Sequence, residues 1–155
     1  MKIDELIQQM SAELFIGDLK ASNKDEALEE LTDAVVAGSQ IKDKKTVLEM
    51  LRNREQLGST ALEKGIAFPH GRSLAVKDLT ILVARSMKGV AFDSEDGKPT
   101  HLFFLLLAPP QDTGNYYLQA LGKIAELVRT DSVCDSMMEV ADFDALTSLL
   151  VEHAT

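Results

Sequence analysis

The apolar run Leu102–Ala108, which ends at Pro109 and Pro110, is the segment that most limits how this chain can fold. A helix that crosses a bilayer takes about 20 apolar residues, so this run is too short to span a membrane. A short run without polar alternation is typical of a strand that is buried on both faces. We therefore expect His101–Ala108 to be a central strand of a sheet that is covered on both sides.

Helix and strand signals surround this run. Leu79–Arg85 is predicted as a second strand, and the turn residues Asp96–Pro99 lie between the two strands. Ser22, three residues before Asp25, predicts the start of a helix by a capping box, and Gly38 predicts its end. Helical spacing of apolar residues predicts helices near Ile3–Met10 and over Asn23–Ala37, Asp43–Arg54, Asn115–Val128, Asp131–Met138 and, capped by Asp142, up to Glu152.

Helices at both ends of the chain with strands in the middle predict an α+β fold. We expect an α/β/α three-layer sandwich, in which a mixed β-sheet is flanked by helices on both faces. The sequence has no repeats and no linker-like stretches, so a single domain over residues 1–155 is expected. The helix at 115–128 is expected to bury Leu118 together with Leu121, Ile124, Ala125 and Val128.

Charge and residue content exclude several classes of protein. The chain has 16 Lys+Arg against 25 Asp+Glu, a net charge of −9, so we expect no nucleic-acid partner and no insertion into a membrane. The single cysteine, Cys134, excludes an intramolecular disulfide and is expected to be an inert thiol, and the absence of a signal-peptide core favours a cytoplasmic protein. The three histidines have no metal-ligand spacing and no nucleotide-binding glycine motif is present, so neither metal nor cofactor is expected.

Chemistry-bearing residues are densest between Arg54 and Arg72. His70 directly follows a short predicted strand at 66–68, between Pro69, which stiffens the backbone, and Gly71, which frees it. Imidazole is mostly neutral in the cytoplasm, so it can attack phosphorus without a separate base. The two arginines and the nearby hydroxyl groups of this region suit an anion such as a phosphoryl group. A loop histidine with a purely structural hydrogen bond is the alternative, and composition alone favours it.

Several segments of the chain resemble one bacterial family. They are Arg54-Glu55, Gly58-Ser59-Thr60, Gly65–Arg72, the turn Asp96–Pro99 before the apolar strand, and the early helix at Lys24–Leu31. Together these segments are similar to the signature of the fructose/mannitol-type IIA domains of the bacterial phosphotransferase system, and of their nitrogen-regulatory relatives. The resemblance covers nearly the whole chain.

This resemblance implies a role for each polar residue of the region. His70 is the implied acceptor of a phosphoryl group from a phosphohistidine on the small carrier HPr or on its nitrogen-system counterpart. Arg54 matches the arginine that supports the phosphoryl group, and Arg72 lies where the family has a basic or polar residue. Ser59 and Thr60 match residues that line the site. Transfer between two histidines makes the protein a phosphotransferase component, and this step needs positioning and charge stabilisation rather than a metal or nucleotide.

One position departs from the family pattern. The family has a second histidine at the start of the helix that follows the apolar strand, and the aligned residue here is Tyr117. A tyrosine can donate a hydrogen bond to a phosphoryl oxygen, but it carries no positive charge near pH 7. Tyr117 is therefore expected either to line the site or to pack in the core. His101 is expected to be a structural strand residue, and His153 to be solvated.

Two functions within the family remain open. We expect a nitrogen-regulatory IIA protein whose phosphorylation is read by regulatory target proteins, because no membrane, IIB or HPr domain is attached and the second histidine is absent. The alternative is a sugar-specific, fructose/mannitol-type IIA component that passes the phosphoryl group to a IIB domain during uptake. A third possibility is a binding module that has lost phosphorylation, but the intact motif around His70 argues against it. A hydrolase that uses Ser59 or Thr60 would need an acidic orienting residue and an oxyanion hole that the sequence does not provide.

Overall fold

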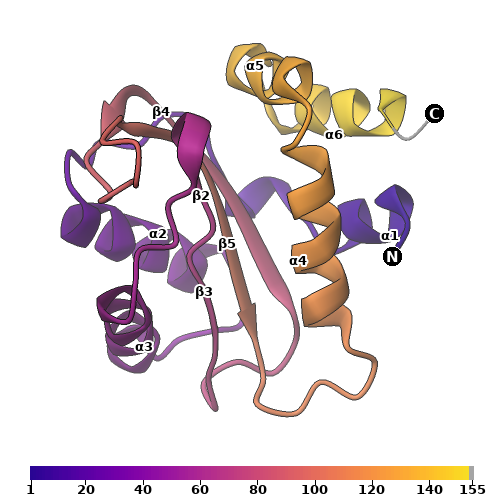
Figure 1. The fold of residues 1–155 in the computed structure, drawn as a ribbon. Coiled ribbons are helices and arrows are strands. Elements are labelled where there is room, and N and C mark those ends of the chain that lie inside the picture. The colour runs from indigo at the N-terminus through magenta and orange to yellow at the C-terminus, as the bar shows by residue number, and fades with distance from the viewer. Residues whose placement is uncertain (154–155) are drawn as a thin grey trace.

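A five-stranded mixed sheet forms the centre of the computed structural model, which describes residues 1–153 (Figure 1). The long strands β4 (Thr80–Val90) and β5 (Thr100–Ala108) pair antiparallel in the middle of the sheet. The short strands β2 (Ile66–Ala67) and β3 (His70–Arg72) both pair parallel with β5 along its other edge. On the far side, β1 (Phe15–Ile16) pairs parallel with β4.

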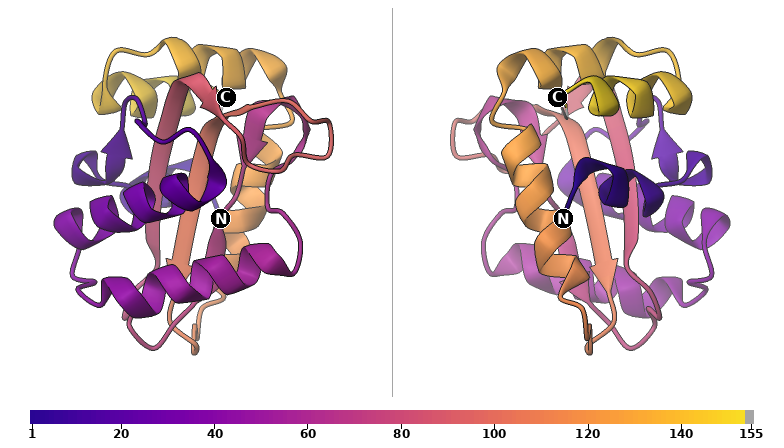
Figure 2. Two further views of the ribbon diagram at one scale, coloured as in Figure 1. Left: turned by 90° about the vertical axis from the view of Figure 1, so that its left-hand side faces the viewer. Right: turned by 90° about the vertical axis from the view of Figure 1, so that its right-hand side faces the viewer.

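Helices cover both faces of this sheet, as Figure 2 shows in two opposite views. On one face lie α2 and α3, and on the other face α1 and α4, while α5 and α6 lie at one end of the molecule (Figure 1). The bounds are α1 Ile3–Gln8, α2 Lys24–Gly38, α3 Lys44–Gln56, α4 Tyr116–Leu127, α5 Asp131–Glu139 and α6 Phe143–Glu152, with the 3₁₀ turns η1 Ala12–Leu14 and η2 Glu63–Gly65. The predicted fold class, a mixed sheet between two helical layers, is confirmed.

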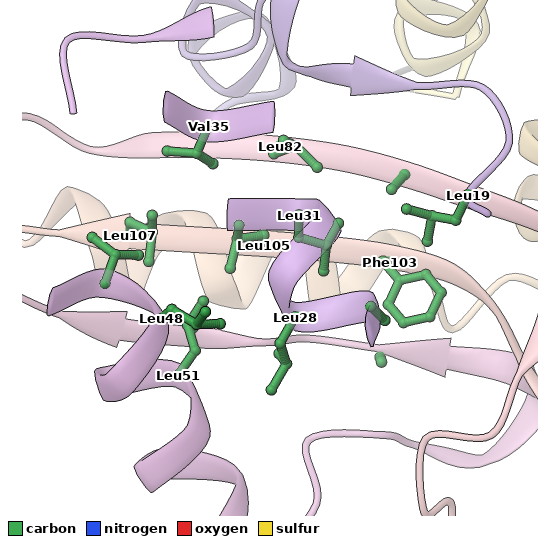
Figure 3. Packing of buried hydrophobic residues seen from close by; sticks show 14 of the residues in the cluster. Leu19, Leu28, Leu31, Val35, Leu48, Leu51, Leu82, Phe103, Leu105 and Leu107 are labelled. Carbon is green, nitrogen blue, oxygen red and sulfur yellow. The ribbon is translucent and has the colours of Figure 1, made fainter. Parts of the chain in front are cut away.

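The side chains of β5 divide the interior into two apolar clusters. Phe103, Leu105 and Leu107 point to the face covered by α2 and α3, where they pack with residues such as Leu31 and Leu51 (Figure 3). The alternate residues of the strand, Leu102, Phe104, Leu106 and Ala108, belong to the cluster under α4. Because successive strand residues point to opposite faces, a run that is apolar throughout suits a strand covered on both sides. The prediction of a buried central strand is confirmed.

Several local predictions differ from the structure. Asn23 rather than Ser22 caps α2, since the Asn23 side chain accepts a hydrogen bond from the Glu26 amide, and Gly38 is the last helical residue rather than the one that follows. The strand expected at 66–68 ends at Ala67, and after Phe68 and Pro69 the chain forms β3 along the same edge of β5. Leu118 is 57% exposed, because its neighbour Tyr117 takes the inward position on α4. The span expected for the domain, 1–155, includes residues 154 and 155, which lie outside the described residues.

Candidate functional site

His70 is fixed at the first position of β3, opposite Leu106 of β5. Its Nδ1 atom lies 2.6 Å from the backbone oxygen of Phe68, and the side chain is partly buried. A carbonyl oxygen only accepts hydrogen bonds, so Nδ1 must carry a proton and donate it. In the neutral ring the free lone pair is therefore on Nε2. The local backbone thus selects one tautomer and leaves the lone pair of the other ring nitrogen free.

A glycine next to this histidine lets helix α3 approach the strand. A Cβ atom added at Gly71 would lie 2.1 Å from the Met50 sulfur, which is far inside van der Waals contact. A larger residue at this position would require the Met50 side chain to move. The glycine of the motif therefore leaves room for the Met50 side chain of α3 beside the histidine.

The side chain of His70 lines an open cavity of about 560 Å³ between α3, β3 and the start of α4. The other lining residues are Met50, Asn53, Arg54, Gln56, Leu57, Gly71, Arg72 and Tyr117. Two of them are arginines, and none of the lining residues among those described is an acid. In a chain with a net charge of −9, such a cavity is a local site of positive charge that favours an anion.

Arg72 is held in place by two contacts. Its Cζ atom lies 4.7 Å from the centre of the Tyr117 ring, and its Nη1 atom donates to the Pro109 oxygen at 3.2 Å. The ring centres of Tyr117 and His70 are 6.3 Å apart. A guanidinium that stacks on an aromatic ring loses little further freedom when it binds an anion, and its remaining N–H groups stay available.

Arg54 enters the cavity from the last turn of α3. Its Nη1 atom donates to the Gly58 oxygen at 2.9 Å, and the side chain is half-buried. The planar fork of an arginine has five N–H donors, so this bond leaves others free for an oxyanion. The structure therefore brings together four of the predicted site residues, His70, Arg54, Arg72 and Tyr117, around one cavity.

Ser59 and Thr60 do not line this cavity. The Ser59 hydroxyl donates to the Phe92 oxygen at 2.8 Å and accepts from Lys24 Nζ at 3.2 Å. Thr60 is buried, and its hydroxyl donates to the carboxylate of Glu55. Sequence reasoning did not single out Glu55, although it stands beside Arg54 in the family signature.

The remaining histidines and the cysteine lie elsewhere. The Nδ1 atom of His101 is 2.8 Å from the Ser86 oxygen in the sheet, and His153 is exposed beyond α6. Cys134 is partly buried, and burial is the main cause that raises the pKa of its thiol, so the thiolate is disfavoured. Within residues 1–153, no three His, Cys, Asp or Glu side chains are grouped as metal ligands.

Tyr117 is the first inward-facing residue of α4, and only 5% of it is exposed. Its backbone amide donates to Asp112 Oδ2 at 2.7 Å, which holds the helix start in place. Burial raises the pKa of its phenol to about 12, against the opposing influence of Arg72 and Arg54. The hydroxyl therefore stays protonated at neutral pH and is a hydrogen-bond donor without charge.

Replacing Tyr117 with Phe is expected to remove a loss of stability at alkaline pH. A tyrosine in the unfolded chain ionises near pH 10, whereas the folded protein keeps this proton up to about pH 12. Between these values the unfolded state binds fewer protons, so stability that is present below pH 10 is lost as the pH rises toward 12, by about 2–3 kcal/mol. Denaturant unfolding of both proteins from about pH 8 to about pH 11.5 measures the difference, and parallel pH profiles would contradict it.

The fold and the cavity define a class of protein: an α/β/α domain that presents one histidine, in a fixed tautomer, between two arginines. The model of the family described as "Phosphoenolpyruvate-dependent sugar phosphotransferase system, EIIA 2" matches residues 8–153. The chain belongs to this family, and it is a IIA domain of the phosphotransferase system.

Named relatives fall into two groups. A nitrogen regulatory protein of Bradyrhizobium diazoefficiens is 36% identical over 150 residues, which are 97% of this chain and 95% of that protein. The fructose-specific EIIABC component of Bacillus subtilis is 28% identical over 153 residues, but the chain spans only 24% of its length. The crystal structure of the nitrogen regulatory protein IIA-Ntr from Neisseria meningitidis superposes with a TM-score of 0.83 at 34% identity, over 92% of this chain and 97% of that one. No helix among the described residues is both long and apolar enough to cross a membrane.

Proposed function

We propose that this protein is a cytoplasmic phosphocarrier in which Nε2 of His70 accepts a phosphoryl group from a phosphohistidine of HPr or of its nitrogen-system counterpart. The observation that carries the proposal is the bond between His70 Nδ1 and the Phe68 oxygen, which leaves Nε2 as the nucleophile. In the transfer, the phosphorus–nitrogen bond of the donor breaks and a bond from phosphorus to Nε2 forms. The proton on Nδ1 stays in place, because the Phe68 oxygen stabilises it as the ring gains positive character.

The two arginines supply the charge stabilisation that this transfer needs. The transferred group carries negative charge on its equatorial oxygens, and catalysis consists mainly of positioning and of stabilising that charge. Arg54 on α3 and Arg72 on β3 line the same cavity as His70, and in this proposal both guanidinium groups bind the phosphoryl group on His70. The protonated hydroxyl of Tyr117 adds a neutral donor.

Exposed apolar side chains close in sequence to the site residues support a protein donor rather than a small molecule. Leu57 lines the cavity and is 85% exposed. Leu118, the residue after Tyr117, is 57% exposed, and Leu74, two residues after Arg72, is 90% exposed. Large apolar side chains exposed to solvent are typical of a surface that docks another protein.

We further propose that the physiological role is regulatory. Support comes from the relatives at 36% and 34% identity, which are named nitrogen regulatory proteins and which the chain covers almost from end to end. A sugar-specific role is the second candidate, because the match to the fructose-specific component extends over 99% of this chain. In that role the phosphoryl group would pass on to a IIB domain.

Phosphorylation assays with two donor systems test this proposal. The protein is incubated with phosphoenolpyruvate, enzyme I and HPr, or with the nitrogen-system pair, and is analysed by intact-protein mass spectrometry at neutral pH. We expect one acid-labile phosphoryl group that forms faster from the nitrogen-system pair. Rapid passage of this group to a sugar-specific IIB domain would favour the second candidate, and no phosphorylation by either pair in folded protein would overturn both.

A further inference from the structure

We propose that Glu55 is a positioning residue for phosphoryl transfer. Its buried carboxylate binds Thr60 and Lys24, and these three residues, called the Glu55 clasp below, fix the positions of Arg54 and His70 relative to each other. The inference rests on the proposed role of His70 as acceptor. It assigns a function to a carboxylate that touches neither the cavity nor the phosphoryl group, and it explains why hydroxyl residues precede the histidine without lining its cavity.

The carboxylate of Glu55 is enclosed and fully engaged. Glu55 is 8% exposed, in the last turn of α3. Its Oε1 atom accepts from the Thr60 amide at 3.0 Å and pairs with Lys24 Nζ at 3.0 Å, while Oε2 accepts from the Thr60 hydroxyl. A buried carboxylate is costly to desolvate unless it is paired and hydrogen-bonded. Here one partner, Thr60, lies in the loop after α3, and the other, Lys24, lies at the start of α2.

Two connections run from the Glu55 carboxylate to residues of the cavity, one through the backbone of a turn and one through a chain of hydrogen bonds. On one side, the turn from Glu55 to Thr60 contains Gly58, whose oxygen accepts from Arg54 Nη1 at 2.9 Å. On the other side, the Thr60 oxygen accepts from the Phe68 amide at 3.1 Å, and the Phe68 oxygen holds His70 Nδ1 at 2.6 Å. The Glu55 carboxylate therefore anchors the turn that orients the Arg54 guanidinium. Through Thr60 it also anchors Phe68, whose oxygen fixes the tautomer of His70.

Lys24 and Ser59 tie this clasp to the rest of the fold. Lys24, the first residue of α2, neutralises Glu55 and also reaches Asp93 Oδ2 at 3.3 Å and the Phe92 ring at 4.9 Å. Ser59 bonds to Lys24 Nζ and to the Phe92 oxygen, so it attaches the same turn to the loop after β4. These contacts give Ser59 and Thr60 a positioning role rather than direct contact with the phosphoryl group.

Two substitutions remove the clasp with little change of volume. Glu55→Gln replaces one acceptor oxygen by a donor and leaves Lys24 without its main counter-charge. Thr60→Val removes the hydroxyl and keeps the shape, and Thr60→Ser restores the hydroxyl as a rescue variant. Two controls lie on the same helix: Arg52→Gln breaks the exposed ion pair with Asp25, and Val47→Ala lowers stability through the core.

The rate of phosphoryl acceptance is measured against donor concentration for each variant, under conditions in which unfolding curves show all of them folded. We expect Glu55→Gln and Thr60→Val to lower the maximal rate by about tenfold to hundredfold, because small misplacements of reacting groups have effects of this size. The donor concentration for half-maximal rate is expected to stay nearly constant. Thr60→Ser, Arg52→Gln and Val47→Ala are expected to transfer at close to the wild-type rate.

A spectroscopic measurement separates this inference from the proposed function. Nitrogen NMR of the His70 ring reports which nitrogen is protonated and needs no phosphorylation. We expect wild-type protein to hold the proton on Nδ1, and Glu55→Gln and Thr60→Val to give a mixture of tautomers. If both variants lose only as much stability as Val47→Ala, keep the tautomer and transfer normally, Glu55 is structural and the inference is overturned. Failure of the wild-type protein to be phosphorylated would overturn the proposed function, and with it any role of Glu55 in transfer, whereas the ring measurement would still show whether Glu55 and Thr60 fix the His70 tautomer.

Discussion

Replacing His70 with Gln is expected to leave a folded protein that no longer accepts a phosphoryl group. The His70 ring makes one local hydrogen bond, to the Phe68 oxygen, and lies at the edge of an open cavity, so its loss affects the apolar core little. A glutamine side chain has a size close to that of histidine, but its amide nitrogen has no free lone pair to attack phosphorus. We therefore expect complete loss of the acid-labile phosphoryl group by mass spectrometry, with an unfolding midpoint close to that of the wild type.

A matched control is available in the same chain. His153 is exposed at the end of α6 and does not line the cavity. His153→Gln is expected to accept a phosphoryl group at the wild-type rate. If His70→Gln still acquires one acid-labile group, or if His153→Gln loses it, the acceptor is not His70 and the mechanism proposed for this cavity is wrong.

The layers of the fold could be predicted from the sequence because burial leaves a strong pattern. The apolar strand 102–108 contributes alternate residues to two cores, and such a strand has no polar positions. The two-residue strand β1 carries no comparable signal, because only its pairing with β4 defines it. The start of α2 depended on whether the side chain of Ser22 or of Asn23 turns toward the free amides of the helix, and sequence proximity does not settle that orientation.

The candidate site could be predicted in part, because its polar residues are close together in the sequence and match a family signature. The density of polar residues between Arg54 and Arg72 indicated His70 and the two arginines, and the family resemblance added Tyr117, and all four line the cavity. The direction of the Ser59 and Thr60 hydroxyls could not be predicted, because it is decided by Glu55, Lys24 and the Phe92 backbone, which lie on three other segments. Spacing along the chain indicates which residues are close together. It does not indicate whether a side chain on a turn points into the cavity or toward the neighbouring segments.

Arg54→Lys is expected to slow phosphoryl acceptance strongly while it changes stability little. The guanidinium already donates one N–H to the Gly58 oxygen and keeps further donors for the phosphoryl oxygens. A lysine ammonium is a compact charge without a planar fork. It cannot donate to the Gly58 oxygen and at the same time bind two phosphoryl oxygens in one plane. Removing one preorganised donor of developing charge typically costs about 10²–10³-fold in rate, and we expect a loss of this size here.

Arg52→Lys is the control that separates a specific effect at Arg54 from a general effect of the arginine-to-lysine change on this helix. Arg52 lies two residues earlier on the same helix, but its fork binds Asp25 on α2 and does not line the cavity. Both changes keep the net charge, so a general effect of charge on docking would slow transfer equally in the two variants. Equal rates for Arg54→Lys and Arg52→Lys would mean that Arg54 serves only the turn at Gly58. A selective loss in Arg54→Lys, with donor binding intact, would locate its action at the transferred group.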